Sequence, residues 1–182
     1  MLLPRWMTSL LRPSRRPAAA PPRAKFWAEV LEDRAVLSAI ATGAAPGEAP
    51  NLPVFDAAGQ ETRAFAAYDA GFAGGVNVAL ADVTGDGTAD VITGTATGAA
   101  HVKVFDGVSF QEVRSFLAFD GFAGGVNVSG GDLNGDRLAD VVVSAASGAS
   151  HVKAFSGADG SELASFLAYG EGFTGGVNVA VG

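Results

Sequence analysis

An eight-residue motif that recurs about every fifty residues constrains the fold more than any other feature of this chain. It reads GFAGGVNV at residues 71–78 and again at 121–128, and GFTGGVNV at 172–179. More than half of the positions in residues 71–105 are identical in residues 121–155. Such a period indicates one supersecondary unit that is copied along the chain and buries its apolar faces against its neighbours.

Each unit has the pattern of four short β-strands. In the first complete unit, apolar and polar residues alternate over residues 76–81, and β-type segments follow at 91–92, 101–105 and 112–119. Glycine clusters separate these segments as hairpin turns do, and no stretch after residue 50 has a helical period. The predicted fold class is all-β, with four-stranded blades of the β-propeller type, because a propeller blade holds four strands in about 40–50 residues.

The number of units is too small for a closed propeller. We expect a partial unit at residues 51–70, complete units at 71–120 and 121–171, and a truncated unit at 172–182. A closed ring needs about 4–8 blades, whereas these units amount to about two and a half blades. The sequence therefore predicts an incomplete propeller, which needs further blades or other chains to complete its sheet packing, because exposed strand edges pair or aggregate.

Residues 1–50 differ in composition from the rest of the chain. They contain seven of the eight prolines but two of the 25 glycines. They also hold seven of the 12 Lys and Arg residues and four of the 19 Asp and Glu residues, so their net charge of +3 leaves −10 on residues 51–182. We therefore expect a domain boundary at Pro50. A basic region, an apolar run over residues 35–45 and an A-x-A site at 39–41 predict an export signal, and a disordered basic arm is the alternative.

An acidic loop between the first and second strands of each complete unit is the candidate site. Oxygen-bearing side chains stand at loop positions 1, 3, 5 and 9, and glycine stands at position 4 in both copies. Ca²⁺ takes about six to eight oxygen ligands, backbone carbonyls included, and three crowded aspartates repel unless a cation neutralises them. The alternative is that Asp and Asn cap tight turns by bonding their own backbone. The candidate Ca²⁺ ligands, with position 7 supplying its carbonyl oxygen, are Asp82, Thr84, Asp86, Thr88 and Asp90 in the first loop and Asp132, Asn134, Asp136, Leu138 and Asp140 in the second.

The two loops depart from familiar calcium motifs in ways that the sequence makes plain. An EF-hand has a glutamate at position 12, whereas these loops have Thr93 and Val143 there. The flanking strands also exclude the helices of an EF-hand. The second loop carries Arg137 at position 6, where glycine would ease the turn.

Three motifs together resemble FG-GAP/VCBS repeats, over residues 51–182. They are F-x-G-G-V-x-V, the acidic loop that ends in Ala-Asp, and G-A-x-H-V-K-x-F. The resemblance implies a β-propeller related to the calcium-binding blades of integrin α-chains, with Ca²⁺ held by the ten loop residues named above. The segment LEDRAVLS also resembles a short LE-x-R motif near the start of large bacterial surface or exported proteins.

Other recurrent residues are expected to have structural roles. His101 and His151 are repeat equivalents one unit apart, so they do not share a site. The phenylalanines recur at fixed positions, which indicates packing between units. Asn77, Asn127 and Asn178 either bond between neighbouring units or face a polar channel.

The expected function is that of a noncatalytic, calcium-binding module of a secreted or cell-surface protein, which mediates adhesion or binds a protein or glycan ligand at the propeller rim. The alternative is a fragment of a propeller enzyme that acts on polysaccharides. A glycosidase needs two non-equivalent carboxylates about 5–9.5 Å apart, but every close acid pair in this sequence repeats with the unit. The acidic repeats disfavour nucleic acid, and no apolar run is long enough to span a membrane. The chain has no cysteine, which excludes disulfides and thiol catalysis.

Overall fold

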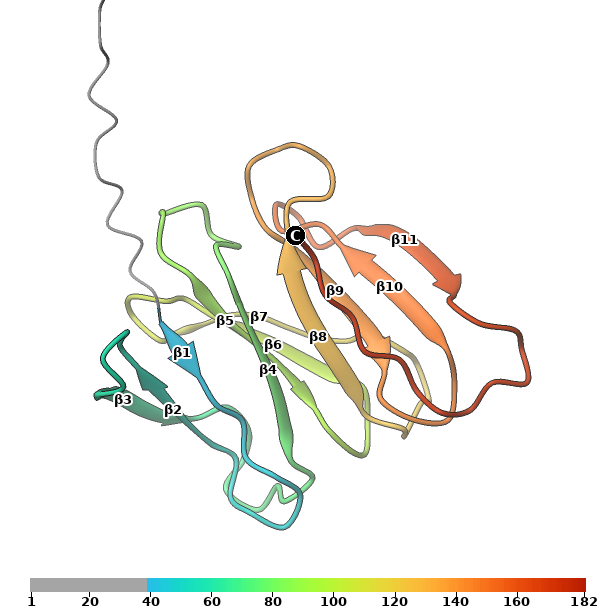
Figure 1. Cartoon of the computed structure of the whole chain (residues 1–182), viewed down its shortest axis with the longest axis horizontal. Helices are drawn as coiled ribbons and strands as arrows, with labels where there is room; N and C mark the ends of the chain where they lie inside the picture. The colour runs from blue at the N-terminus through green and yellow to red at the C-terminus, as the bar shows by residue number, and fades with distance from the viewer. Residues whose placement is uncertain (1–38) are drawn as a thin grey trace, which may run out of the picture. The chain divides into compact units, whose positions relative to one another are not determined.

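The computed structural model describes residues 39–182, and every element of regular structure in this range is a β-strand. In each of three antiparallel sheets, neighbouring strands follow one another along the chain (Figure 1). Among the same residues, no helix is long and apolar enough to cross a membrane. The described chain is therefore all-β, as the periodicity predicts. The first sheet consists of β1 (Ile40–Ala41), β2 (Asn51–Phe55) and β3 (Glu61–Ala66), the second of β4 (Val76–Ala81), β5 (Asp90–Thr95), β6 (His101–Phe105) and β7 (Glu112–Leu117), and the third of β8 (Val126–Gly131), β9 (Asp140–Ala145), β10 (His151–Phe155) and β11 (Glu162–Leu167).

The sheets share one register, in agreement with the repeat in the sequence. Val78 on β4 pairs with Thr93 on β5, and fifty residues later Val128 on β8 pairs with Val143 on β9. The pairing of the last two strands shifts at the same place in every sheet, directly before a phenylalanine: Phe55, Phe105 and Phe155. Because register decides which face each side chain takes, equivalent residues occupy equivalent sites in the three sheets.

The strand β1 lies ahead of the boundary that composition predicts at Pro50. Ile40 pairs with Phe55 as Val91 pairs with Phe105, so β1 is the counterpart of β5. Composition averaged over fifty residues does not detect a strand of this length. The predicted A-x-A site lies at the start of this sheet, whereas the basic region and the LEDRAVLS segment lie outside the described residues.

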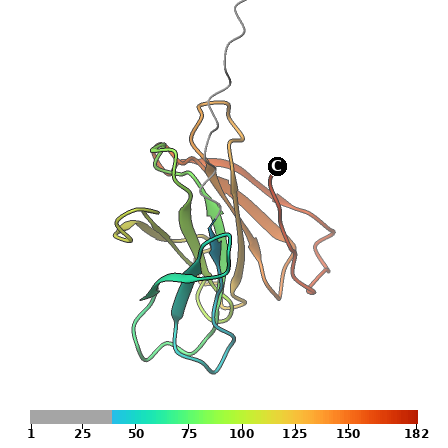
Figure 2. The same cartoon turned by 60° about the vertical axis from the view of Figure 1, so that its left-hand side comes forward.

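Apolar side chains on the facing sides of consecutive sheets form the core. Between the second and third sheets, Ile92 and Val104 belong to one buried cluster with Val126 and Val143. The strand β8 contacts both β4 and β5, so the first strands of these two sheets lie side by side (Figure 1 and Figure 2). Aromatic pairs connect consecutive sheets, as predicted, with ring centroids 4.9 Å apart for Phe65 and Phe105 and 4.8 Å apart for Phe116 and Phe155.

The second glycine of each GG pair joins a sheet to the one before it. Gly125 has a φ of 69°, a left-handed conformation that favours glycine, and a Cβ there would overlap the carbonyl oxygen of Ala96. Its amide donates to the carbonyl oxygen of Gly98 (3.0 Å), and its own carbonyl oxygen accepts the amide of Ala146 (3.0 Å). A Cβ on Gly176 would likewise overlap the carbonyl oxygen of Ala146. The repeated motif is therefore a junction between sheets.

Residues 172–182 form no strand, although the repeat predicts the first strand of a truncated unit there. They lie along the third sheet, where the amide of Val177 donates to the carbonyl oxygen of Ala145 (2.9 Å). Val177 and Val179 pack against a buried cluster that includes Val142. A strand requires a ladder partner, and none of the described residues occupies the second-strand position of this unit.

Candidate functional site

The aspartate at loop position 9 is completely buried in both copies and connects the loop to a neighbouring turn. Asp90 and Asp140 begin β5 and β9, and each has an exposed fraction of 0%. Asp90 accepts the amide of Val83 (2.8 Å) at Oδ2 and the amide of Gly107 (2.8 Å), in the turn after β6, at Oδ1. Asp140 makes the equivalent pair of bonds in the third sheet. A buried carboxylate is tolerated when such donors replace water.

The aspartate at position 1 closes the loop on itself. Asp82 accepts the amide of Gly85 at Oδ1 (2.7 Å) and that of Gly87 at Oδ2 (2.9 Å). Asp132 accepts the equivalent amides, the second of which belongs to Arg137 (2.9 Å). These amide donors, Arg137 foremost, hold the pKa of Asp132 below its ordinary value, because they stabilise the ionised form.

The aspartate at position 5 caps the second half of the loop. Asp86 and Asp136 each use Oδ1 to accept the amide of the residue at position 7, at 2.7 and 2.8 Å. Asn134 donates its side-chain amide to Oδ2 of Asp136 (3.0 Å), whereas Thr84 at the same position of the first loop donates to Asp90 (3.4 Å).

These contacts are the turn-capping bonds that the sequence left as the alternative to metal binding. Within residues 39–182, no three Asp, Glu, His or Cys side chains are grouped so that they could hold a metal ion. The donor set consists only of oxygen, as a hard cation such as Ca²⁺ requires, so the chemistry of the residues fits the ion. A bound ion would require the carboxylates of each loop to lie closer together than they do here. The Ca²⁺ assignment stays a prediction.

The two loops also contact each other, although they belong to different sheets. The amide of Ala139 donates to the carbonyl oxygen of Asp82 (2.8 Å). The side chain of Leu138, at position 7 of the second loop, lies so close to Gly85 of the first that a Cβ there would overlap it. A change in the conformation of one loop therefore alters the contacts of the other.

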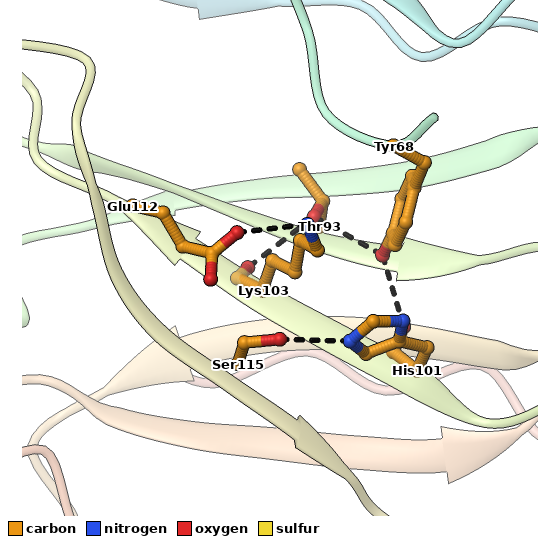
Figure 3. A network of polar contacts seen from close by, with 6 residues as sticks. All are labelled: Tyr68, Thr93, His101, Lys103, Glu112 and Ser115. Carbon is orange, nitrogen blue, oxygen red and sulfur yellow. Dashed lines mark hydrogen bonds and ion pairs between the residues drawn. The ribbon is translucent and has the colours of Figure 1, made fainter. Parts of the chain in front are cut away.

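A second polar cluster lies on β6 and β7 and is drawn in Figure 3. Lys103 pairs with Glu112 (2.7 Å), and Nε2 of His101 lies 2.8 Å from Oγ of Ser115. Burial, and then the charge of Lys103, lower the pKa of His101. The third sheet repeats the arrangement with the pairs Lys153–Glu162 (2.8 Å) and His151–Ser165 (2.8 Å).

The sequence did not point to Tyr68, which also belongs to this cluster. The hydroxyl of Tyr68 lies 3.2 Å from Oγ1 of Thr93 and donates to the carbonyl oxygen of His101 (2.9 Å), which joins the first sheet to the second (Figure 3). Burial raises the pKa of Tyr68 to about 12. The repeat could have signalled it, because Phe119 stands at the equivalent place one unit later.

The recurrent asparagines bond between sheets, which decides between the two roles left open by the sequence. The side-chain amide of Asn77 donates to the carbonyl oxygen of Val126 (2.8 Å) and to Oδ1 of Asn127 (2.9 Å). Asn127 donates in turn to the carbonyl oxygen of Val177 (2.7 Å) and to Oδ1 of Asn178 (3.1 Å). The three amides form a ladder across the first strands of successive units.

An apolar pocket of about 230 Å³ lies between the first and second sheets. Its walls include Val54, Leu80 and Phe110, and its polar residues are Asp56, Thr62 and Thr88, of which Asp56 and Thr62 bond to backbone atoms of the same hairpin. The pocket therefore offers space for apolar groups and no free acid–base pair.

Comparisons with family models, with curated proteins and with solved structures find no match to this chain.

Proposed function

We propose that this chain is a noncatalytic module of β-propeller-type blades resembling FG-GAP/VCBS repeats, and that its two acidic loops bind Ca²⁺. We place it in an exported or cell-surface protein, where it mediates adhesion or binds a protein or glycan. One observation carries the proposal: two loops fifty residues apart hold aspartates at positions 1, 5 and 9 in the same hydrogen-bonded frame.

The stacking of the sheets supports the blade assignment. Each four-stranded sheet is a simple meander, and the first strand of the second sheet, β4, lies against the first strand of the third, β8. Sheets that meet through equivalent glycines, asparagines and phenylalanines are related by one repeated operation, which is how blades are arranged about an axis.

In this proposal the same loop positions supply the Ca²⁺ ligands in both loops. Asp82, Asp86 and Asp90 would hold the ion in the first loop, and Asp132, Asp136 and Asp140 in the second. The position-7 carbonyls and the oxygens of Thr84 and Asn134 would complete the two sets. When bound, the cation supplies positive charge to a region of net charge −10. The buried aspartates keep each loop tied to the turn beside it.

The repetition of the polar cluster supports a noncatalytic role. A His–Ser pair and a Lys–Glu pair occur in both complete units, with distances that agree within 0.1 Å. A catalytic centre needs groups with different tasks, and pairs that recur unchanged on both four-stranded sheets fit a structural task. Among residues 39–182, no contact favours the alternative of a polysaccharide-cleaving fragment.

Thermal melts of the full chain with Ca²⁺ and with EDTA test the proposal. We expect Ca²⁺ to raise the melting temperature, since a ligand at about a hundred times its Kd adds about 2.7 kcal/mol per site. The double variant Asp86→Ala with Asp136→Ala is expected to lose this rise. Circular dichroism in EDTA shows whether the variant is still folded.

A matched control is available on the same sheets. Asp56 and Asp106 also cap their own turns, one repeat apart and outside the acidic loops. The double variant Asp56→Ala with Asp106→Ala removes the same charge and is expected to keep the rise. If the loop variant keeps the full rise, or if both variants lose it equally, the ligand assignment is wrong.

A further inference from the structure

Residues 177–182 occupy on the third sheet the place that β8 occupies on the second. Asn77 donates to the carbonyl oxygen of Val126 (2.8 Å), and Asn127 donates in the same way to that of Val177 (2.7 Å). Exposure alternates along the segment, with odd-numbered residues half-buried and even-numbered residues exposed, as in a strand that has one covered face. The segment is placed as the first strand of a further sheet.

The third sheet presents aromatic side chains beyond this segment. Phe166 is 53% exposed, whereas its counterpart Phe116 packs edge-on against Phe155 of the following sheet. Tyr169 is 56% exposed, whereas its counterpart Phe119 is 8% exposed. A groove of about 420 Å³, lined by Phe166 and by residues 177–181 among others, opens on this face. The face is shaped for a neighbour that the described residues do not supply.

Among the described residues, the first sheet has no strand in the first-strand position, which is the position that residues 177–182 occupy beside the third sheet. Its three strands correspond to the second, third and fourth strands of the other sheets, and no described residue fills the first-strand position. Ile40 on β1 is 50% exposed, whereas its counterpart Val91 is 1% exposed. Phe55 on β2 stands at the position where Phe105 receives a phenylalanine from the preceding sheet.

We infer that the third sheet binds the first sheet of a second copy of this chain, with residues 177–182 of one copy pairing with β1 of the other to complete a four-stranded sheet. The argument for this occupant is continuity with the two sheet-to-sheet contacts inside the chain. A second copy brings Ile40 and Phe55 to the places that Val91 and Phe105 take in the contact between the first and second sheets. The inference uses the repeat register and the blade-type stacking, and it does not depend on calcium.

Two different surfaces meet in this contact, so it is a head-to-tail contact. Such a contact leaves one free surface at each end of a pair, and copies add until a ring closes or a filament grows. Each added copy contributes its three sheets and supplies the first strand that the next copy lacks.

The strand register identifies the residues that would face each other between two copies. In the second sheet Ala79 pairs with Ile92, and in the third Ser129 pairs with Val142. The corresponding partners between two copies are Ala180 and Ala41, because Ala41 pairs with Val54 as Ile92 pairs with Val104. Directly opposed residues of antiparallel strands have Cβ atoms about 4.5–5.5 Å apart, near the separation that a disulfide needs.

Cross-linking tests this register in a chain that has no cysteine of its own. Full-length Ala41→Cys and Ala180→Cys chains are mixed under mild oxidation, and we expect the mixed disulfide dimer well above the dimer that either chain forms alone. The matched control replaces Ala41→Cys by Val108→Cys, which lies in the exposed turn after β6. Equal cross-linking of the two mixtures would overturn the register.

Sedimentation velocity over a range of concentrations tests the association itself. Phe166→Ser is expected to weaken it about tenfold or more, because a central aromatic contact contributes at least one such factor. Val108→Ser, which removes another exposed apolar side chain (64% exposed), is expected to leave it unchanged. A full-length chain that stays monomeric throughout overturns the inference and leaves the calcium proposal, which is tested by the melts, untouched.

Discussion

At the residue scale, comparison of equivalent positions in the repeats identifies the residues that depart from the common pattern. In the part of the chain that the structure describes, two residues other than glycine have a positive φ, Phe110 at 59° and Arg137 at 75°, and their counterparts are Gly160 and Gly87. Phe110 is compensated, because its ring packs on that of Phe65 (5.3 Å between centroids). Among the contacts of the described residues, the side chain of Arg137 takes part in no hydrogen bond or ion pair. The sequence could identify Arg137 as the odd residue of its loop, but not the compensation at Phe110.

We therefore expect Arg137→Gly to stabilise the protein. Relief of the left-handed backbone is worth about 1–2 kcal/mol, and the extra freedom of glycine in the unfolded chain takes back about 0.4–1 kcal/mol. The net gain in the free energy of unfolding is on the order of 1 kcal/mol, measured by urea denaturation. Phe110→Gly serves as the comparison and is expected to destabilise, since it removes the packing that offsets the strain. If both variants raised the free energy of unfolding, backbone strain alone would determine the effect of glycine at these positions.

At the element scale, strand positions and the packing of phenylalanines between sheets could be predicted, but the backbone contacts between sheets could not. Alternation of apolar residues tells which side chains face a core, so the strands over residues 76–81 and 101–105 were located correctly. It does not tell which backbone atoms of another sheet an amide will reach. The role of Gly125 depends on such atoms, and so does the choice between the two roles that the sequence left open for Asn77. The strand β1 was not predicted either, because it lacks the acidic loop that precedes β5 and β9.

The glycine junction leads to a prediction with an internal control. Gly121 and Gly125 have nearly the same φ, 68° and 69°, but a Cβ on Gly121 meets open space while one on Gly125 overlaps the carbonyl oxygen of Ala96. Gly121→Ala should therefore lose about 1–2 kcal/mol from backbone strain alone. Gly125→Ala should lose clearly more and also lower hydrogen-exchange protection at Ala146. Similar losses in stability for the two variants would contradict the junction.

At the scale of the whole molecule, an all-β repeat architecture followed from the fifty-residue period, because the same strands recur in the same register. What could not be predicted is how the carboxylates are used. The spacing of acids is the same whether they cap turns or hold an ion, and only coordinates show the amide bonds of Asp82 and Asp90. The contacts between sheets are also unequal, since Tyr68 joins the first pair of sheets and Phe119 the second.

This inequality predicts a sensitivity to alkaline pH. Burial raises the pKa of Tyr68 from 10.0 to about 12, so the unfolded chain releases the phenolic proton more readily than the folded one. The associated stability is fully present below pH 10 and is lost as the pH rises towards 12. In melts between pH 10 and 12, Tyr68→Phe should remove the part of the stability loss that comes from ionisation of this tyrosine. At neutral pH the variant should be less stable by about 0.5–1.5 kcal/mol, because the hydrogen bonds of the hydroxyl are lost. Tyr169→Phe, at an exposed site, should leave the alkaline loss intact.

The asparagine ladder has a geometric consequence. Asn77 and Asn127 each span the distance from one first strand to the next with a single side-chain amide. That side chain therefore bridges the first strands of successive units, while the aromatic pairs of Phe65 and Phe116 bridge the last strand of one sheet and the third strand of the next. In the proposed arrangement of blades about an axis, the difference between these two spacings would set how far each repeat turns from the last.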